Sequence, residues 1–209
     1  MASAPNDFVG ASGRYYRFKE LLQERHILVV YGRDQFVLKD IPKDMLSSFN
    51  GDIRPKLNES LYIRLPLDTI PGHSILVYKY LTNDFLGLGR KQLPMLARKR
   101  ILQDCLRGIA ELHDRQVVHL DIKPDNIMLN CHSTGQEMIV EQVQITGLEN
   151  AAYLPKGRCI KGMLAGNDNW RSPEAYFKGE LNKPTDIFSF GVMASAFTLL
   201  ESLFANIPR

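Results

Sequence analysis

The chain has 209 residues, of which 44% are hydrophobic and 23% are charged, and its formal net charge is +3. These values are ordinary for one folded domain or two small lobes, and they exclude a disordered or fibrous chain. The densest basic cluster, Arg98–Arg100, lies inside an apolar-periodic segment and indicates a solvated helix face, so we expect no nucleic-acid partner.

The N-terminal third is predicted to form strands. Two β-rich runs, 27–31 and 36–39, are joined by turn residues, and a third run covers 75–81. We therefore expect a small antiparallel sheet over residues 27–81, preceded by a poorly defined segment over residues 1–26.

The middle of the chain changes to a helical period. Apolar residues recur every four positions from Leu93 to Ile109, which predicts an amphipathic helix of about five turns that ends near His113. Strands before this helix and helices after it predict an α+β fold with two lobes, a hinge near Tyr80-Leu81 and a second lobe over residues 82–209.

Short β runs follow this helix. Two of them, 127–129 and 143–145, are separated by a polar loop predicted over 130–136. The last third is irregular until Asp186, which is placed to cap an apolar helix that starts at Ile187.

Cysteine usage and the apolar runs bear on the compartment. Cys105, Cys131 and Cys159 are widely separated and lack metal-ligand spacing, which predicts free thiols in a reducing, intracellular compartment, cytoplasmic or nuclear. Met1–Arg14 contains no secretory apolar stretch. The run Ile187–Leu200 is shorter than the roughly 18 to 20 residues that cross a bilayer, so we expect no membrane association.

The segment Val118–Leu129 has the most chemical content. Asp121 is followed by Lys123 two residues later and by Asn126 five residues later, with apolar strand residues on both sides. This arrangement resembles the catalytic loop of the protein kinase family, and the lysine resembles its serine/threonine class.

The resemblance implies ATP-dependent phosphoryl transfer to serine or threonine hydroxyls of proteins, with ATP and Mg²⁺ as cofactors. It also implies that Asp121 orients the substrate hydroxyl and accepts its proton, that Lys123 contacts the transferred phosphate, and that Asn126 binds magnesium. Phosphoryl transfer needs little covalent help from an enzyme, so positioning and charge stabilisation explain these residue types.

Later segments extend the resemblance. Ser172–Glu174 stands where kinases close the activation segment with Ala-Pro-Glu, and Asp186–Gly191 resembles the start of the buried central helix of the C-lobe. The resemblance implies a structural role for Asp186, hydrogen bonding to the catalytic-loop backbone. The residues around Trp170 are similar to a kinase-like branch common in filamentous fungi.

Upstream, Val37–Lys39 at the end of a strand resembles the Val-Ala-Ile-Lys segment of kinases. The resemblance implies that Lys39 holds the α- and β-phosphates of ATP, and it extends over roughly Phe36–Leu200. The carboxylate that pairs with this lysine would come from a weak helical segment, with Asp52 and Glu59 as the alternatives.

The metal-binding motif departs from the family pattern. Kinases place Asp-Phe-Gly after the strand corresponding to 143–145, where this chain has Thr146–Asn150. Gly147 takes the place of the magnesium-binding aspartate, and glycine offers no side-chain oxygen to a hard cation. Glu149 is the alternative metal ligand if the loop shifts register.

The glycine-rich phosphate loop is also missing. Upstream of Lys39 only Gly32 lies close, while Gly10 and Gly13 are too distant. The N-lobe is therefore predicted to be degenerate. Leu120 replaces the arginine that contacts a phosphorylated activation segment, which disfavours regulation by such phosphorylation.

The chain stops at Arg209, soon after the central helix. The resemblance then implies a truncated C-lobe, in which Glu174 lacks its usual arginine partner and one flank of the helix at Ile187–Leu200 is exposed.

Two hypotheses follow. The first is a serine/threonine protein kinase with impaired transfer; the second is a pseudokinase that acts as a protein-interaction module without phosphotransfer. A small-molecule kinase of the same fold is disfavoured by Ser172–Glu174, which resembles protein kinases. The expected partner is a protein in both cases, as substrate or as docking partner.

Overall fold

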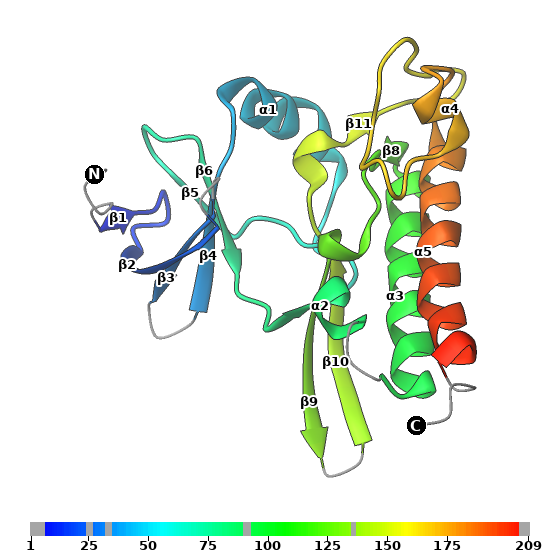
Figure 1. Cartoon of the computed structure of the whole chain (residues 1–209). Helices are drawn as coiled ribbons and strands as arrows, with labels where there is room; N and C mark the ends of the chain where they lie inside the picture. Colours follow the sequence, from blue (N-terminus) through cyan, green and yellow to red (C-terminus); the bar gives the residue numbers. More distant parts are fainter. Residues whose placement is uncertain (1–6, 24–26, 32–34, 90–92, 135–136, 205–209) are drawn as a thin grey trace.

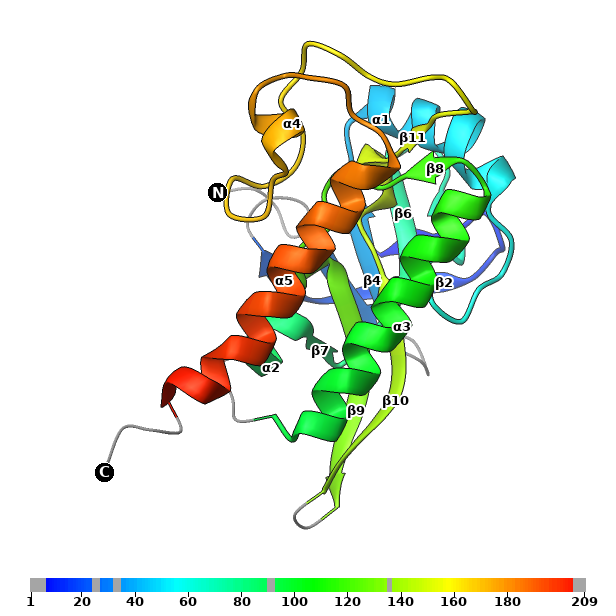
Figure 2. The same ribbon diagram turned by 90° about the vertical axis from the view of Figure 1, so that its right-hand side faces the viewer.

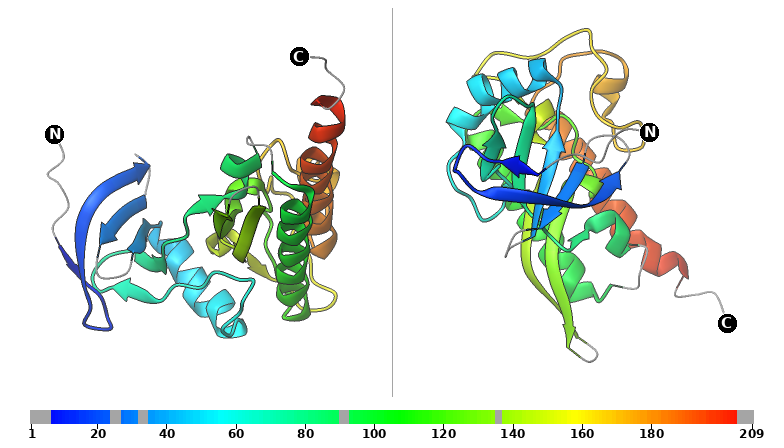
Figure 3. Two further views of the ribbon diagram at one scale, coloured as in Figure 1. Left: turned by 90° about the horizontal axis from the view of Figure 1, so that it is seen from below. Right: turned by 90° about the vertical axis from the view of Figure 1, so that its left-hand side faces the viewer.

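The computed structural model describes residues 7–23, 27–31, 35–89, 93–134 and 137–204. These residues form two lobes, which lie side by side in Figure 1 and are seen from below in the left part of Figure 3. The N-terminal lobe is built on an antiparallel sheet, and the C-terminal lobe contains two long helices and a β-hairpin. The predicted α+β, two-lobed architecture is confirmed.

The N-lobe sheet has the strand order β1-β2-β3-β4-β6-β5, with antiparallel pairing throughout. Its strands are β1 (Phe8–Val9), β2 (Tyr15–Gln23), β3 (Ile27–Tyr31), β4 (Gln35–Asp40), β5 (Asp68–Ile70) and β6 (Ile75–Lys79). The three strands expected from the sequence are β3, β4 and β6. Residues 24–26 and 32–34, which include Gly32, the glycine closest upstream of Lys39, lie outside the described residues.

The sheet also takes in residues that lie before position 27. The strand β2 pairs with β3, although its sequence shows no clean alternation of apolar and polar residues that would have predicted a strand. One face of the sheet carries a small core to which β2, β4, β5 and β6 contribute buried side chains. They are Tyr16, Phe36, Leu38, Ile70, Ile75 and Val77.

A buried carboxylate joins the first hairpin to the last strand of the sheet. Asp68 on β5 accepts hydrogen bonds from the Ser12 backbone N–H (3.2 Å) and from the Tyr16 hydroxyl (2.9 Å). A Cβ added to Gly10 would lie 2.0 Å from an oxygen of Asp68, so only glycine fits where the hairpin meets β5. Burial, then the hydrogen bond and charge of Asp68, raises the pKa of Tyr16 to about 12.

A short helical segment connects the sheet to the C-lobe. It consists of α1 (Lys43–Ser48), a π-helical turn (Phe49–Ile53) and a 3-10 turn (Arg54–Lys56). Phe49 and Ile53 are buried, whereas proline in the last turn stops the helix from continuing.

The C-lobe is built around two helices that pack against each other, α3 (Met95–Asp114) and α5 (Lys183–Phe204), as the side view in Figure 2 shows. A β-hairpin is formed by β9 (Ile127–Thr134) and β10 (Glu137–Ile145). The remaining strands and α-helices are short: β7 (Asn83–Asp84), α2 (Phe85–Gly89), β8 (Val117–Val118), β11 (Ala152–Tyr153) and α4 (Pro173–Tyr176).

The predicted amphipathic helix is confirmed as α3. Its buried face contains Ala97, Ile101, Cys105, Ile109 and Leu112, which are 5% exposed or less. The last four of these pack in the main core of the protein. The four-residue spacing placed these side chains on one face, as expected for a helix against a core.

Two predicted boundaries are wrong. The polar loop expected over 130–136 is β-strand through Thr134, because β9 pairs with β10 along a hairpin in which residues 132–134 are exposed and therefore tolerate polar side chains. The apolar helix begins at Lys183 rather than at Ile187, so Asp186 lies inside its first turn and is not its N-cap.

One flank of α5 is exposed, as expected: Ile187 is 46% and Phe188 42% accessible to solvent. Within the described ranges, none of the helices combines the length and apolar composition needed to cross a bilayer.

Candidate active site

Asp186 fixes the backbone of the catalytic loop through hydrogen bonds. Its side chain is 1% exposed, and its two oxygens accept hydrogen bonds from the backbone N–H groups of His119 and Leu120, both at 2.8 Å. His113 Nε2 lies 2.9 Å from the same carboxylate. The structural role that the kinase resemblance implied for Asp186 is confirmed.

These bonds hold Leu120 in an unusual backbone conformation. Its φ is +66°, in the left-handed region that costs a non-glycine residue on the order of 1–2 kcal/mol. The side chain is 6% exposed and packs with Leu154, Ala165 and Ala175 beneath the activation segment. Leu120, which the resemblance aligned with the kinase arginine, therefore makes an apolar contact in this structure.

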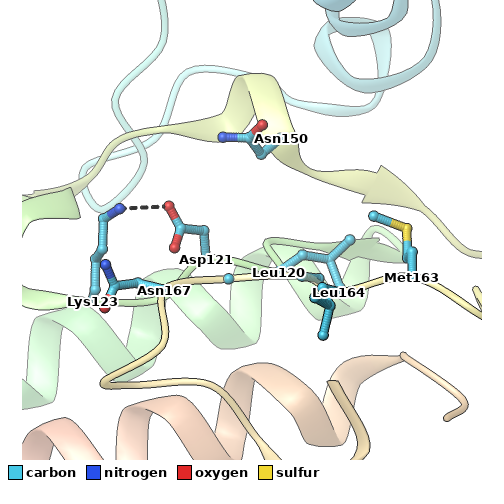
Figure 4. Close-up of a pocket in the computed structure, with 9 residues that line it drawn as sticks. Leu120, Asp121, Lys123, Asn150, Met163, Leu164 and Asn167 are labelled. Carbon is cyan, nitrogen blue, oxygen red and sulfur yellow. Dashed lines mark ion pairs between the residues drawn. The ribbon is translucent and has the colours of Figure 1, made fainter. Parts of the chain in front are cut away.

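The three side chains expected from the catalytic-loop pattern converge. Lys123 Nζ lies 2.9 Å from Asp121 Oδ2, and Asn126 Nδ2 donates to the same oxygen at 3.1 Å and to the Asp121 carbonyl at 2.8 Å. Figure 4 shows the Asp121–Lys123 ion pair beside Asn167, with Asn150 across the space above it. The carboxylate is therefore held in place, with one cation beside it.

Gly147 faces this loop. The Thr146 N–H donates to the Asn126 carbonyl (2.9 Å), and the Thr146 carbonyl lies 2.8 Å from His119 Nε2. These two bonds bring Gly147 so close that an added Cβ would lie 2.9 Å from Asn126 Oδ1. The position aligned with the kinase metal-binding aspartate is thus directed at the catalytic loop, without a carboxylate.

Glu149 points to the N-lobe instead. Its Oε2 accepts from Lys39 Nζ at 2.8 Å and its Oε1 accepts from the Tyr78 hydroxyl at 2.7 Å. The residue is 5% exposed. Burial alone would raise the pKa of Glu149, but the Lys39 ammonium and the hydrogen bonds from Lys39 and Tyr78 hold that pKa below its usual value. Burial and the Glu149 charge raise the pKa of Tyr78 well above its ordinary range.

This arrangement corrects the expected partner of Lys39. The sequence offered Asp52 or Glu59 from the helical segment after β4, yet both are exposed, and Glu149 from the far side of the cleft forms the ion pair. Sequence reasoning considered Glu149 only as a metal ligand. No local pattern joins two residues that are 110 positions apart.

Two adjoining cavities meet at the catalytic loop. One, of about 380 Å³, is lined by Asp121 and by the activation-segment residues Met163–Asn167. The other, of about 390 Å³, lies between the lobes and is lined by Lys39, by Tyr80 and Leu81 of the expected hinge, and by Asn126. Lys123 and Asn167 line both cavities, so a group in one has a direct neighbour in the other. Figure 4 shows Met163 and Leu164 at the apolar end of the first cavity.

Arg64 is a cavity residue that sequence reasoning missed. It lies in the segment between α1 and β5 and is 8% exposed. Its backbone N–H donates to the Ile145 carbonyl at 2.8 Å. Its Nη2 donates to the Lys79 carbonyl at 2.6 Å and its guanidinium lies 5.1 Å from the centre of the Tyr78 ring. The only signal for it would have been an arginine in an otherwise apolar segment.

The oxygen donors near Gly147 differ from those that magnesium prefers, which are carboxylate oxygens in octahedral geometry. Both oxygens of Glu149 are bonded to Lys39 and Tyr78, and Asp121 is paired with Lys123. Among the described residues, no group of three or more His, Cys, Asp or Glu side chains is arranged to hold a metal ion. Asn126 remains as a neutral candidate donor, so this set does not fit a kinase magnesium site.

The end of the activation segment is held by its own neighbours. The Ser172 hydroxyl accepts from the Ala175 N–H (3.3 Å) and caps α4. Glu174, which was expected to lack a partner, accepts a hydrogen bond from the Thr185 hydroxyl at 3.0 Å. Arg171 donates to the carbonyls of Ala165 and Gly166 and closes the loop that lines the first cavity.

Comparisons with known proteins agree with this geometry. The protein kinase domain family matches residues 63–208. The serine/threonine-protein kinase CLA4 of Eremothecium gossypii is 30% identical over 93 residues, which cover 44% of this chain and 11% of that protein. A probable LRR receptor-like serine/threonine-protein kinase of Arabidopsis thaliana is 33% identical over 130 residues, which cover 58% of this chain and 12% of that protein.

A solved kinase structure has a similar fold. The crystal structure of the yeast RNA Pol II CTD kinase CTDK-1 complex contains a chain that superposes with a TM-score of 0.71 at 16% identity, covering 87% of this chain and 61% of that one. The matched segment is about a tenth of the length of the curated relatives. With a family match over most of its length and the catalytic-loop geometry described above, this chain belongs to the protein kinase family.

Proposed function

We propose that this chain is a serine/threonine-type protein kinase domain whose phosphoryl transfer is strongly impaired. The observation that carries the proposal is the close approach of Gly147 to Asn126. The backbone at Gly147 lies next to the catalytic loop, but this position has no carboxylate. Electrostatic stabilisation of the transferring phosphate is usually the largest catalytic contribution, so this loss is expected to lower the rate about a thousandfold or more.

The remaining site residues support roles in binding and orientation. Asp121 is placed to receive the proton of a substrate hydroxyl in the first cavity, and Lys123 lies between the two cavities, where it can contact the transferred phosphate. Lys39 lines the interlobe cavity and would contact the phosphates of ATP there, after partial release from Glu149. Asn126 is the one residue retained for a magnesium ion.

A phosphotransfer assay tests this proposal. The purified chain is incubated with labelled ATP, magnesium and a generic protein substrate, beside an Asp121→Asn variant as the control. We expect no transfer above that control. Transfer that depends on Asp121 and exceeds the control by orders of magnitude would refute the impairment.

The variant Gly147→Asp sharpens the same test. Aspartate tolerates a left-handed backbone better than most residues, and the crowding at Asn126 involves the end of a side chain that can shift. If the missing carboxylate is the main defect, this variant gains measurable Asp121-dependent transfer. The gain is expected to be partial, because the sequence also lacks a glycine-rich phosphate loop upstream of Lys39.

A second candidate is a protein-interaction module without phosphotransfer. It is favoured by the hydrophobic side chains exposed near the activation segment, where Tyr176 is 61% and Phe177 79% accessible. Binding of a protein partner that is lost in Phe177→Ser but kept in Asp121→Asn would support this candidate over the enzyme.

A further inference from the structure

The interlobe cavity contains an arginine whose hydrogen-bonding capacity is incompletely used. Arg64 is 8% exposed, and its Nε is buried without a hydrogen-bond partner among the described residues. A buried donor without an acceptor costs about 1–3 kcal/mol, and a guanidinium has five donors to satisfy. In native proteins such a group finds its acceptor in the protein, in an ordered water or in a ligand.

The structural partners of Arg64 leave this group incompletely satisfied. Its Nη2 donates to the Lys79 carbonyl, and its ring contact is with Tyr78. Glu149 is a carboxylate whose charge acts on Arg64, but its two oxygens already accept from Lys39 and from the Tyr78 hydroxyl. Burial lowers the pKa of Arg64 to about 10, so the side chain remains a cation at neutral pH.

The charges that line the cavity are unequal. Its wall includes three cations, Lys39, Arg64 and Lys123, and one carboxylate, Asp125. Two carboxylates that do not line this cavity pair with two of these cations: Asp121 with Lys123, and Glu149 with Lys39. Arg64 is thus the cavity cation without an ion pair to a carboxylate among the described residues. Lys39 and Arg64 line the same cavity and contact the two members of one hydrogen-bonded pair, since Lys39 bonds Glu149 and Arg64 lies against the ring of Tyr78.

We propose that Arg64 is a ligand-binding residue of this cavity, and that with Lys39 and Lys123 it allows the phosphates of a nucleoside triphosphate to bind without a divalent metal ion. Phosphate charge that a kinase offsets with magnesium is offset here by side chains, and guanidinium is well suited to phosphate oxygens because it forms paired, charge-assisted hydrogen bonds. The inference rests on the proposed function only in placing the nucleotide in this cavity.

Isothermal titration calorimetry of the full chain with ATP tests the inference, first in EDTA and then with magnesium. We expect ATP to bind in EDTA with a Kd within about threefold of the value in magnesium. Arg64→Met, which keeps the length of the side chain but removes the charge, is expected to weaken ATP binding in EDTA about tenfold or more. Arg64→Lys keeps the charge without the paired donors and is expected to fall between the two.

Two controls separate phosphate binding from a general effect on the fold. Adenosine lacks phosphates, so its affinity is expected to be the same for the parent chain and Arg64→Met. Arg98→Met removes another buried arginine, one that lies in α3 and donates to the carbonyls of Leu93 and Phe197. This control is expected to lower the melting temperature while leaving the affinity for ATP unchanged. If Arg64→Met does not fold, Arg64→Lys carries the comparison.

The outcomes distinguish the two proposals. ATP binding that requires magnesium overturns the metal-independent site but leaves the impaired kinase standing. Equal ATP affinity in the parent chain and Arg64→Met, or an equal loss for adenosine, overturns the role of Arg64. Absence of ATP binding in either buffer overturns the placement of the nucleotide in this cavity, whereas the phosphotransfer assay decides impairment independently.

Discussion

The catalytic loop, His119–Asn126, and the segment that faces it, Thr146–Asn150, are each anchored by a buried carboxylate. In the catalytic loop, Asp186 bonds backbone N–H groups and leaves the functional side chains available. In the facing segment, Glu149 bonds side chains, and one of them is the cavity lysine, Lys39. The first carboxylate thus fixes the course of the backbone, whereas the second fixes the position of a side chain in the cavity.

Removing the backbone anchor should have the largest effect. Asp186→Ala leaves two buried N–H groups without acceptors, so we expect the free energy of unfolding to fall by about 3 kcal/mol or more. Urea denaturation followed by circular dichroism measures the change. Asp114→Ala, at an exposed position at the end of α3, is the control and should change stability little. An equal, small effect of both substitutions would contradict the anchoring role of Asp186.

Removing the side-chain anchor should cost less. Glu149→Gln replaces a charged acceptor with a neutral one, and we expect a loss of about 1–3 kcal/mol, moderated because the Lys39 side chain is 29% exposed and can be hydrated. Tyr78→Phe removes only the hydroxyl bond to Glu149 and should cost about 1 kcal/mol. Denaturation curves that show no loss for Glu149→Gln would mean that the ion pair contributes nothing to the fold.

The close approach of the two segments can be tested through their glycine. Gly147 and Gly157 have φ angles of +86° and +81°, but only Gly147 has atoms within 4 Å of an added Cβ. Alanine at either position should cost about 1–2 kcal/mol from the backbone alone. Gly147→Ala should lose up to about 1 kcal/mol more, because Asn126 must shift. Equal losses in thermal unfolding would show that the two segments are not in close contact.

Acidification should weaken the side-chain anchor by the smallest amount. The pKa of Glu149 is lower in the folded chain than in the unfolded one, so its contribution is present above the unfolded value, about 4.3, and is lost as the pH falls through the folded value. The parent chain should therefore lose more stability than Glu149→Gln between pH 5 and pH 3. Parallel stability curves for the two proteins over this interval would contradict the lowered pKa.

The sequence alone determined the features that depend on neighbours along the chain. The spacing of Asp121, Lys123 and Asn126 predicted one site, and the structure brings these side chains together. The four-residue period predicted α3, because helical periodicity is a local property. The position of Gly147 after a strand predicted an approach to the catalytic loop without a carboxylate.

Tertiary structure decided the features that depend on distant residues. Lys39 pairs with Glu149, 110 positions away, rather than with an acidic residue of the intervening helix, because the two lobes close on each other at this point. Arg64 has no motif, and only its burial at the wall of the cavity indicates a role. Such contacts are set by how packed elements meet in space, and no periodicity in the chain encodes that meeting.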